Sequence, residues 1–397
     1  MNVTVKPKKL SGVIGAISSK SDAHRKIICA SLCEEPVKIF INGFSKDIEA
    51  TMRCVSALGA NVLRNSDSVV IKMGKSPENP ELFCGESGST ARFLLPVAAC
   101  LSDGFTMTGE GRLPTRPFTD LVRQMAEHGC RFSSESLPMS VSGRLTGGEF
   151  SINGNISSQY ISGLLMALPS CCEDSKITLL SPLQSGAYVD MTIDTLRLFG
   201  IEIKLTDTGY FIPGNQKFKS PKSTICDGDW SNAAFFLASC ECGCDVRVLG
   251  LDIASTQGDK AFLSAAKEDT VDVSEIPDLV PPLAVVAASK RGVTVFKNAG
   301  RLRLKESDRL VSVSDMINSL GGKAEILGDS LKITGNGRLS GGVVNSYSDH
   351  RIVMASAVAS VISDGEIKIL GAEAADKSYP SFFDDFKTLG GEIYAEY

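Results

Sequence analysis

A pattern that recurs six times along the 397-residue chain limits its possible folds more than any other feature. In each copy, a short run of small, polar or charged residues opens an apolar stretch of helical length, and a β-rich run follows. The openings begin at Ser19, Gly88, Ser157, Asp229, Pro277 and Ser348. They are separated by 69, 69, 72, 48 and 71 residues. A fixed period near 70 residues predicts a repeat architecture, with a shortened fourth copy.

Two further markers keep the same period. The β-rich runs begin at Val37, Phe105, Lys176, Asp245, Val293 and Glu366. A second helix is expected in each copy, and in five copies it ends near a glycine, which takes a left-handed conformation without strain. These glycines are Gly59, Gly129, Gly200, Gly321 and Gly390. Alternating residues around polar turns predict hairpins in 61–73, 201–212 and 323–334.

Six units of this length suggest two globular domains of three units each. The polar, basic and proline-containing segment GNQKFKSPKS, which begins at Gly214, is typical of a linker. The sixth unit ends in a single strand, EIYAEY, and the N-terminal MNVTVKP is a candidate for its missing hairpin arm. We therefore predict an N-terminal three-repeat domain over 18–222 and a C-terminal three-repeat domain over 1–17 and 227–397. Residues 214–227 would be the linker or hinge, and we expect domain closure around a ligand, since clefts between domains are preferred ligand sites.

Composition excludes several classes of protein. With 43% hydrophobic and 22% charged residues, the chain has the composition of an ordinary globular protein. Its net charge of −5 argues against a nucleic-acid binder, although one cleft can still be basic. We see neither a membrane-spanning run nor a secretory signal, so we expect a cytoplasmic protein whose 12 cysteines are thiols.

We expect no metal and no cofactor. Cys240, Cys242 and Cys244 form a C-x-C-x-C cluster, but structural zinc usually needs a wider spacing and a second ligand pair. The three histidines are not paired with one another at helical spacing. The P-loop and dinucleotide-binding glycine patterns are both missing from the sequence, which argues against a P-loop kinase and a dehydrogenase.

The openings of the repeated helices indicate anion binding. Their hydroxyl, aspartate and glycine residues suit N-caps, and a helix N-terminus attracts anions through its free N–H groups. Several openings add a cation, namely Lys20, Arg25, Arg92 and Arg351. A single opening is most simply an ordinary cap, but recurrence together with the cations favours an anion site. If the segment RLRLKESDRL is helical from about Lys305, Lys305 and Arg309 share one face of the helix.

Eight motifs occur in order over nearly the whole chain. They are SKSDAHR, GESGSTAR, LPTRPF, SSQY, IPD, LKESDR, SDHR and DKSYP. Together they closely resemble the 5-enolpyruvylshikimate-3-phosphate synthase family. The resemblance implies a two-domain inside-out α/β barrel of six βαβαββ-type repeats, three per domain. It also implies transfer of the enolpyruvyl group of phosphoenolpyruvate to the 5-hydroxyl of shikimate 3-phosphate, a step of the shikimate pathway to chorismate and the aromatic amino acids. We expect a monomer that acts on these small molecules, without nucleic acid or membrane.

The resemblance also assigns residues to each substrate. It implies that phosphoenolpyruvate is held by Lys20, Gly88, Arg116, Gln159, Arg309, Arg351 and Lys377. It implies that shikimate 3-phosphate is held by Lys20, Ser21, Arg25, Ser157, Ser158, Gln159, Ser185, Asp278 and Lys305. Arginine suits both ligands, because its planar guanidinium bonds two oxygens at once.

The implied chemistry is addition followed by elimination, through a tetrahedral intermediate. By the resemblance, Asp278 is the base for the 5-hydroxyl, and Glu306, Lys20 and His350 are the candidates for moving the other proton. A glutamate among cations normally has a lowered pKa, so a proton-donating Glu306 would need burial or substrate charge. Orientation and fixed charge should supply most of the rate.

The chain departs from the family's pattern near the expected phosphoenolpyruvate site. Ser89 stands where many members have threonine, and Phe93 stands where some have proline. The response to the inhibitor glyphosate therefore does not follow from the resemblance. Arg301 stands where some members have a substrate-contacting asparagine, so that contact is not carried over.

Two alternatives remain open at this point. UDP-N-acetylglucosamine enolpyruvyl transferase shares the fold and the donor, but that family usually has a cysteine in the loop before an Arg-Pro pair, and the loop GEGRLPTRPF has none. A non-catalytic anion-binding repeat protein would need the cations of the site but not Asp278 and Glu306.

Overall fold

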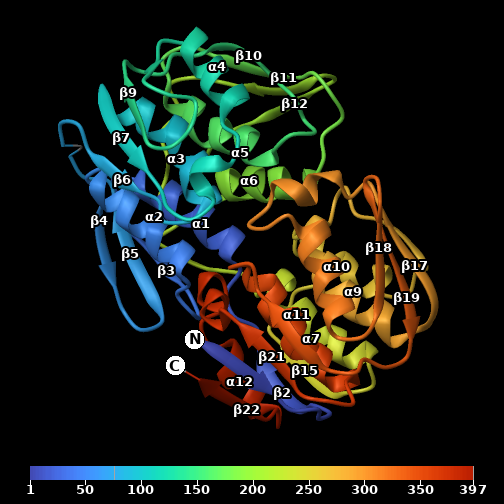
Figure 1. The fold of residues 1–397 in the computed structure, drawn as a ribbon. Coiled ribbons are helices and arrows are strands. Elements are labelled where there is room, and N and C mark those ends of the chain that lie inside the picture. Colours follow the sequence, from blue (N-terminus) through green and yellow to red (C-terminus); the bar gives the residue numbers. More distant parts are fainter. Residues whose placement is uncertain (76, 397) are drawn as a thin grey trace. The chain divides into compact units, whose positions relative to one another are not determined.

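The computed structural model describes residues 1–75 and 77–396 and divides into two compact units (Figure 1). One unit is Lys20–Cys226, here called the N unit. The other is Met1–Ser19 with Asp227–Tyr397, here called the C unit. The segment 214–227, expected to be a linker, contains the strand β14 (Ser223–Ile225), which belongs to a sheet of the N unit.

The described part of the N unit contains four-stranded sheets that share one plan. In each sheet, a parallel pair is followed by an antiparallel hairpin. The first sheet has the order β14, β3 (Val37–Phe40), β5 (Ser68–Lys72) and β4 (Asn61–Arg64). The second has the order β6 (Glu81–Phe83), β7 (Gly104–Thr108), β9 (Met139–Ser142) and β8 (Arg131–Phe132). The third has the order β10 (Gly148–Ile152), β11 (Ser175–Leu179), β13 (Gly209–Ile212) and β12 (Lys204–Thr206).

The helices of the N unit form its interior. The repeat openings lead into α1 (Lys20–Ser31), α3 (Gly88–Leu101) and α5 (Ser158–Ala167), which confirms these predicted starts. These helices are buried on nearly every side, because their apolar residues do not keep to one stripe. The second helices of the copies are α2 (Lys46–Ala57), α4 (Thr119–Glu127) and α6 (Gly186–Leu198), and 3₁₀ turns lie at Leu113–Thr115 and Leu168–Ser170. One hydrophobic core joins these helices to the inner faces of the sheets.

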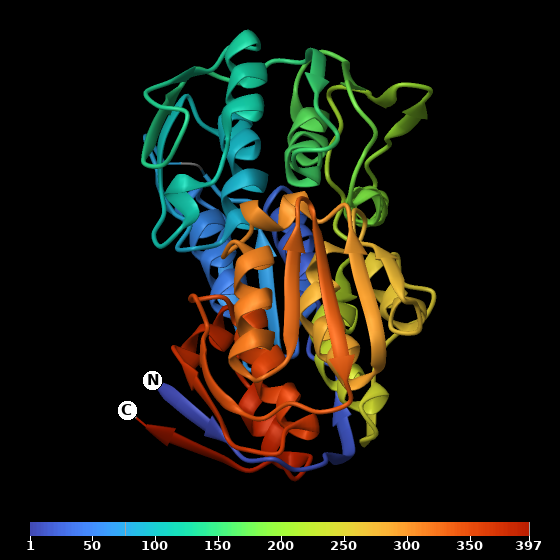
Figure 2. The same cartoon turned by 45° about the vertical axis from the view of Figure 1, so that its right-hand side comes forward.

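The C unit repeats the plan with one reduced copy. Its short sheet pairs β2 (Ser11–Gly15) with β15 (Asp245–Leu249). A second sheet has the order β16 (Thr270–Asp272), β17 (Arg291–Lys297), β19 (Ser330–Asn336) and β18 (Lys323–Leu327), and Figure 2 shows its long orange strands. The third has the order β20 (Gly342–Asn345), β21 (Ile367–Leu370), β1 (Asn2–Val5) and β22 (Ile393–Glu396).

Helices again make up the interior of this unit. The first helices of the copies are α7 (Trp230–Glu241), α9 (Val280–Ser289) and α11 (His350–Ala359), and the second helices are α8 (Phe262–Ala265), α10 (Arg309–Ser319) and α12 (Phe382–Thr388). Short 3₁₀ turns are η3 (Gly258–Ala261), η4 (Pro277–Leu279), η5 (Gly300–Leu304), η6 (Ser360–Ile362) and η7 (Ala372–Lys377). No helix among residues 1–75 and 77–396 is long and apolar enough to cross a membrane.

The N-terminal strand completes the sixth repeat, as the sequence predicted. β1 lies between β21 and β22 and is antiparallel to both, with Asn2 opposite Leu370 on one side and Glu396 on the other. Val3 and Val5 point into the core and are almost fully buried. The strand therefore supplies backbone pairing and apolar contacts that the rest of the sixth copy lacks.

The five glycines expected at the ends of second helices have positive φ angles, between 75° and 98°. This confirms the left-handed helix ends predicted from the sequence. The expected helix from Lys305 is wrong: Gly300–Leu304 forms η5, Lys305 has extended backbone, and α10 begins only at Arg309. The cause is Asp308, whose carboxylate accepts the Val311 N–H and caps the helix there.

A proline in β1 tests its place in the sheet. Thr4→Pro removes a backbone donor from a strand paired on both sides, so we expect the free energy of unfolding of the C unit to fall by about 1–3 kcal/mol. Thr4→Ala keeps the donor and is the control. Equal thermal unfolding midpoints for the two variants would contradict this role of β1.

Candidate active site

A buried group of charged residues gathers at helix openings of the C unit. Asp278 comes from η4, Arg309 is the first residue of α10, and Asp349 and Arg351 belong to the opening of α11. Lys305 and Glu306 lie in the short segment between η5 and α10. We call these six residues the Asp278 cluster.

The carboxylate of Asp278 is surrounded by cations. Its Oδ1 lies 2.7 Å from Arg309 Nη1 and 3.2 Å from Lys305 Nζ, and its Oδ2 lies 3.4 Å from Arg351 Nη2. Arg351 Nη1 also donates to the Asp278 backbone carbonyl, at 3.1 Å. The side chain of Asp278 is 19% exposed, so its carboxylate remains within reach of a ligand.

Arg309 is the most deeply buried cation of the cluster, with a side chain only 1% exposed. Besides Asp278, its guanidinium contacts Glu306 Oε2 at 2.8 Å and Asp349 Oδ2 at 2.8 Å. Ser307 donates a further hydrogen bond to Asp349 at 2.9 Å. A buried arginine needs such neutralisation, because an unpaired buried charge is strongly destabilising.

These contacts set the ionisation of the cluster. Burial raises the pKa of Asp278, but Arg351, Lys305 and Arg309 outweigh it and hold this pKa well below its ordinary value of 3.8. Burial lowers the pKa of Lys305, and Asp278 opposes that effect only in part. For Arg309, burial lowers the pKa, but Asp349, Glu306 and Asp278 together raise it. The free protein therefore holds Asp278 as a carboxylate paired with cations.

The structure adds residues that the sequence analysis did not select. Asp349 is fully buried, bonds Arg309 through its side chain and accepts the Arg351 N–H at 3.0 Å as the cap of α11. Ser231, in the opening of α7, accepts Arg351 Nη2 at 2.7 Å. Both lie in openings that the repeat had marked, SDHR and DWSN. A rule that treats the cap residue itself as part of a site would have found Asp349.

Two other expected site residues, His350 and Lys377, also belong to the C unit. His350 is the first residue of α11, with its ring 1% exposed and its Nδ1 3.7 Å from Asp349 Oδ1. Lys377 is buried at the end of η7. The structure thus places His350 beside the Asp278 cluster through Asp349.

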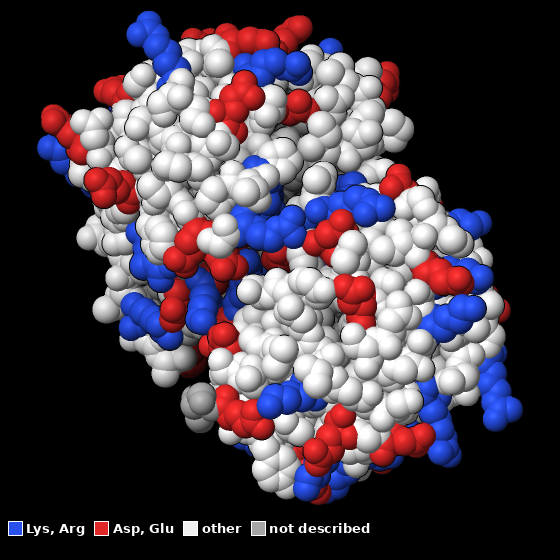
Figure 3. All heavy atoms as spheres, viewed as in Figure 1, with Lys and Arg blue, Asp and Glu red and all other residues white. Residues whose placement is uncertain are grey.

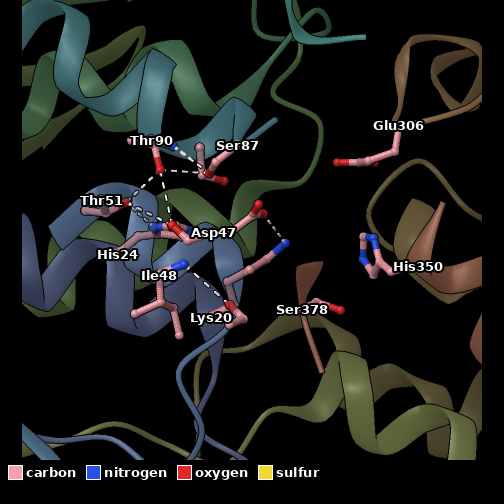
Figure 4. A network of polar contacts seen from close by, with 12 residues as sticks. Lys20, His24, Asp47, Ile48, Thr51, Ser87, Thr90, Glu306, His350 and Ser378 are labelled. Atoms are coloured by element: carbon pink, nitrogen blue, oxygen red, sulfur yellow. Dashed lines mark hydrogen bonds and ion pairs between the residues drawn. The ribbon is translucent and has the colours of Figure 1, made fainter. Parts of the chain in front are cut away.

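In the N unit, α1 begins with a paired lysine. Lys20 Nζ lies 2.8 Å from Asp47 Oδ2, and Asp47 is in the first turn of α2 (Figure 4). One turn further along α1, Arg25 is almost fully buried and donates to Thr192 Oγ1 and to the Tyr188 and Ser21 carbonyls. Burial lowers the pKa of Arg25 to about 10, so it stays charged at neutral pH.

The openings of α3 and α5 are joined by an arginine and a glutamine. Arg92 Nη1 donates to Gln159 Oε1 at 2.8 Å, and Gln159 Nε2 donates to Ser89 Oγ at 2.9 Å. A Cβ on Gly88 would stand only 2.6 Å from Arg116 Nη1, so glycine is what allows the Arg116 guanidinium to approach the backbone here. Arg92 lies at one of the predicted helix openings, but the motifs do not assign it to either substrate.

Three of the expected serines lie at helix openings. Ser157 caps α5 and accepts the Gln159 N–H at 3.3 Å, and Ser158 is the buried first residue of that helix. Ser185 precedes α6 with a φ of 59°, a left-handed conformation that is uncommon for a non-glycine residue. Such a conformation costs energy and clusters at ligand sites.

Positively and negatively charged side chains are not separated on the face of the molecule that Figure 3 shows. Figure 3 shows lysines and arginines interspersed with acidic residues over one face, as the net charge of −5 allows. Local cation groups, rather than the net charge, therefore decide where an anion binds. In the described part of the chain, no group of three or more His, Cys, Asp or Glu side chains could hold a metal ion, and the twelve cysteines are free thiols.

Comparison with known proteins gives one consistent family. The family model for EPSP synthase (3-phosphoshikimate 1-carboxyvinyltransferase) matches residues 4–269 and 263–386. The 3-phosphoshikimate 1-carboxyvinyltransferase of Clostridium novyi (strain NT) is 40% identical, covering 99% of this chain and 98% of that protein. The enzyme of the same name from Clostridium acetobutylicum is 41% identical, with coverage of 99% and 98%.

Solved structures agree on the fold. An EPSP synthase from Acinetobacter baumannii superposes with a TM-score of 0.83 at 22% identity, covering 100% of both chains. The enolpyruvyl transferase NikO from Streptomyces tendae superposes with a TM-score of 0.79 at 14% identity, covering 99% of this chain and 98% of its own. The sheet units and their helices thus define a repeat protein of the inside-out α/β class. The chain belongs to the EPSP synthase family, as the eight motifs predicted.

The buried histidine of α1 predicts a pH dependence of stability. Burial lowers the pKa of His24 to about 3, with Lys20 and Arg25 adding to the effect and Asp47 opposing it. The unfolded chain binds this proton near the ordinary pKa of 6.5, so the contribution of His24 is present above pH 6.5 and is lost as the pH falls towards 3. We expect a loss of up to about 1.4 kcal/mol per pH unit in that window.

His24→Asn tests this directly, because asparagine preserves the hydrogen bond to Thr51 but does not titrate. The thermal unfolding midpoint of the variant should fall less steeply between pH 6.5 and 5 than that of the wild type. Parallel curves for the two proteins would show that His24 is not the group responsible.

Proposed function

We propose that the chain is a 3-phosphoshikimate 1-carboxyvinyltransferase, which transfers the enolpyruvyl group of phosphoenolpyruvate to the 5-hydroxyl of shikimate 3-phosphate and releases phosphate. The observation that carries the proposal is the Asp278 cluster, which combines a partly exposed carboxylate with cations suited to phosphate and carboxylate groups. Family membership supports the same activity and does not favour the two alternatives considered above. The enzyme would act in the shikimate pathway, in the cytoplasm and as a monomer, without nucleic acid or membrane.

We assign phosphoenolpyruvate to the cations and to the helix openings that carry them. Its proposed ligands are Lys20, Gly88, Arg116, Gln159, Arg309, Arg351 and Lys377. The opening of α3 suits a phosphate or carboxylate, because its free N–H groups lie next to Gly88, which carries no side chain. Arg351, held by Ser231 and the Asp278 carbonyl, is oriented before any substrate binds.

We assign shikimate 3-phosphate to a second set of residues. These are Lys20, Ser21, Arg25, Ser157, Ser158, Gln159, Ser185, Asp278 and Lys305. Ser157 and Ser158 lie at the opening of α5, where hydroxyls and backbone N–H groups suit a phosphate monoester. Asp278 would accept the 5-hydroxyl.

Catalysis needs Asp278 to become a better base than it is in the free protein. Its pKa is held down by Arg351, Lys305 and Arg309. Anionic substrates that bind these cations neutralise part of their charge, which raises the pKa of Asp278 when the 5-hydroxyl is in place. Asp278 then takes the hydroxyl proton while the oxygen attacks C2 of phosphoenolpyruvate.

The methylene carbon must gain a proton and later lose one. Glu306, Lys20 and His350 are our candidates for this transfer. Glu306 is paired with Arg309, and Lys20 with Asp47, so each is oriented by a partner of opposite charge. Loss of the proton then expels phosphate from the tetrahedral intermediate.

Replacing the proposed base separates chemistry from binding. Asp278→Asn keeps the shape and most hydrogen bonds of the side chain but removes its basic charge. We expect kcat to fall at least ~10²-fold, the usual scale for a general base. The Kd of shikimate 3-phosphate, measured by calorimetry, should change much less. Turnover near that of the wild type would assign the role of base to another group.

The acceptor and the independence from metal are tested in one assay. Phosphate release from phosphoenolpyruvate should require shikimate 3-phosphate and should not occur with UDP-N-acetylglucosamine. The rate should survive treatment with EDTA and removal of the chelate, because cations of the chain already neutralise the phosphates. A rate that only a divalent ion restores, or one that depends on the nucleotide sugar, would contradict the proposal.

A further inference from the structure

A chain of short hydrogen bonds runs through the interior of the N unit (Figure 4). His24 Nδ1 lies 2.7 Å from Thr51 Oγ1, Thr51 Oγ1 lies 2.6 Å from Thr90 Oγ1, and Thr90 Oγ1 lies 2.8 Å from Ser87 Oγ. All four residues are fully buried, at 0% exposure. We call them the hydroxyl chain. None of them belongs to the proposed ligands of either substrate.

The hydroxyl chain connects three helices near their N-terminal ends. His24 lies on α1, Thr51 on α2, and Thr90 in the first turn of α3. Ser87 is the N-cap of α3, and its Oγ also accepts the Thr90 N–H at 3.2 Å. The last link therefore ends at the residue directly before Gly88.

The protonation of His24 gives the hydroxyl chain a direction. His24 Nε2 has no hydrogen-bond partner among the described residues and lies in a wholly buried ring. A buried N–H without an acceptor is rarer than a buried acceptor without a donor. The single proton of the neutral imidazole therefore belongs on Nδ1, which donates to Thr51. Thr51 then donates to Thr90, and Thr90 to Ser87, so that every link has one donor and one acceptor.

We propose that the hydroxyl chain positions the opening of α3 for phosphoenolpyruvate. This inference rests on the proposed function, which assigns that opening to phosphoenolpyruvate. The opening is closely packed, because a Cβ on Gly88 would stand 2.6 Å from Arg116 Nη1 and 3.0 Å from Arg92 Nη1. A small shift of the first turn would change the distance from its N–H groups to a bound anion. Thr51 acts as a positioning residue, since it reaches the opening through Thr90 and Ser87, and both threonine hydroxyls also lie 3.5 Å from the Asp47 carbonyl oxygen.

Replacing the central threonine tests the proposal. Thr51→Val keeps the shape of the side chain and removes the hydroxyl that joins His24 to Thr90. We expect the KM and Kd for phosphoenolpyruvate, with shikimate 3-phosphate present, to rise roughly tenfold. The kcat should change less than about threefold, because no reacting group is removed.

Binding of shikimate 3-phosphate provides an internal comparison. Arg25, one of its proposed ligands on α1, is held by Thr192, Tyr188 and Ser21, outside the hydroxyl chain. The Kd of shikimate 3-phosphate, measured by calorimetry, should therefore stay within about twofold of the wild type. A merely structural role of Thr51 would move both dissociation constants together.

Two control variants isolate the hydroxyl. Thr51→Ser restores it and should recover the affinity for phosphoenolpyruvate. Thr195→Val removes a comparably buried threonine hydroxyl of α6, which donates only to the Met191 carbonyl, and should leave that affinity unchanged. If Thr51→Val does not fold, Thr90→Val breaks the next link and the same measurements apply.

Three results would overturn the inference: unchanged affinity of Thr51→Val for phosphoenolpyruvate, equal effects of Thr51→Val and Thr195→Val, or no recovery in Thr51→Ser. A wild-type protein without phosphate release dependent on shikimate 3-phosphate would instead contradict the proposed function. The binding measurements on phosphoenolpyruvate would still decide the role of the hydroxyl chain.

Discussion

The buried guanidinium of Arg309 is the interaction on which the site of the C unit depends. It contacts the carboxylates of Asp278, Glu306 and Asp349, which come from three separate segments of the chain. Removing one partner of such a group leaves a buried charge without compensation, which is far more costly than losing a surface ion pair. The segments that carry these carboxylates are therefore held in one arrangement before any substrate arrives.

The repeat explains why such a site forms at helix openings. Each first helix is buried on nearly every side, so its N-terminal N–H groups cannot all reach water and need caps. Ser87, Ser157, Asp229 and Asp349 supply such caps to α3, α5, α7 and α11 through their side chains. In α11 the cap Asp349 also bonds Arg309. One aspartate therefore satisfies a free N–H group at the helix N-terminus and orients a cation.

Much of the fold could be predicted because it depends on local patterns. The helix openings, the strands and the glycines that end the second helices recur at a nearly fixed period in the sequence. The pairing of β1 was predicted because the sixth copy lacks one arm of its hairpin. The helix considered from about Lys305 was wrong, because Asp308 caps α10 and sets its start at Arg309. Motifs gave the residues proposed as substrate ligands, but they assigned no role to Asp349, Ser231 or Thr51. The roles of these residues lie in partners that are remote in sequence, such as Arg309, Arg351 and Thr90.

Cations set the ionisation of Asp278, and we propose that a bound anion relaxes this control. Carbon-13 NMR of the protein labelled at aspartate carboxyl carbons, with Asp278→Asn to assign the signal, measures that ionisation directly. In the free protein the Asp278 signal should remain that of a carboxylate well below pH 3.8, down to the point where the fold is lost. With shikimate 3-phosphate bound, its titration should move to higher pH. Titration of the free protein at or above pH 3.8, or a midpoint that the ligand leaves unchanged, would contradict the account.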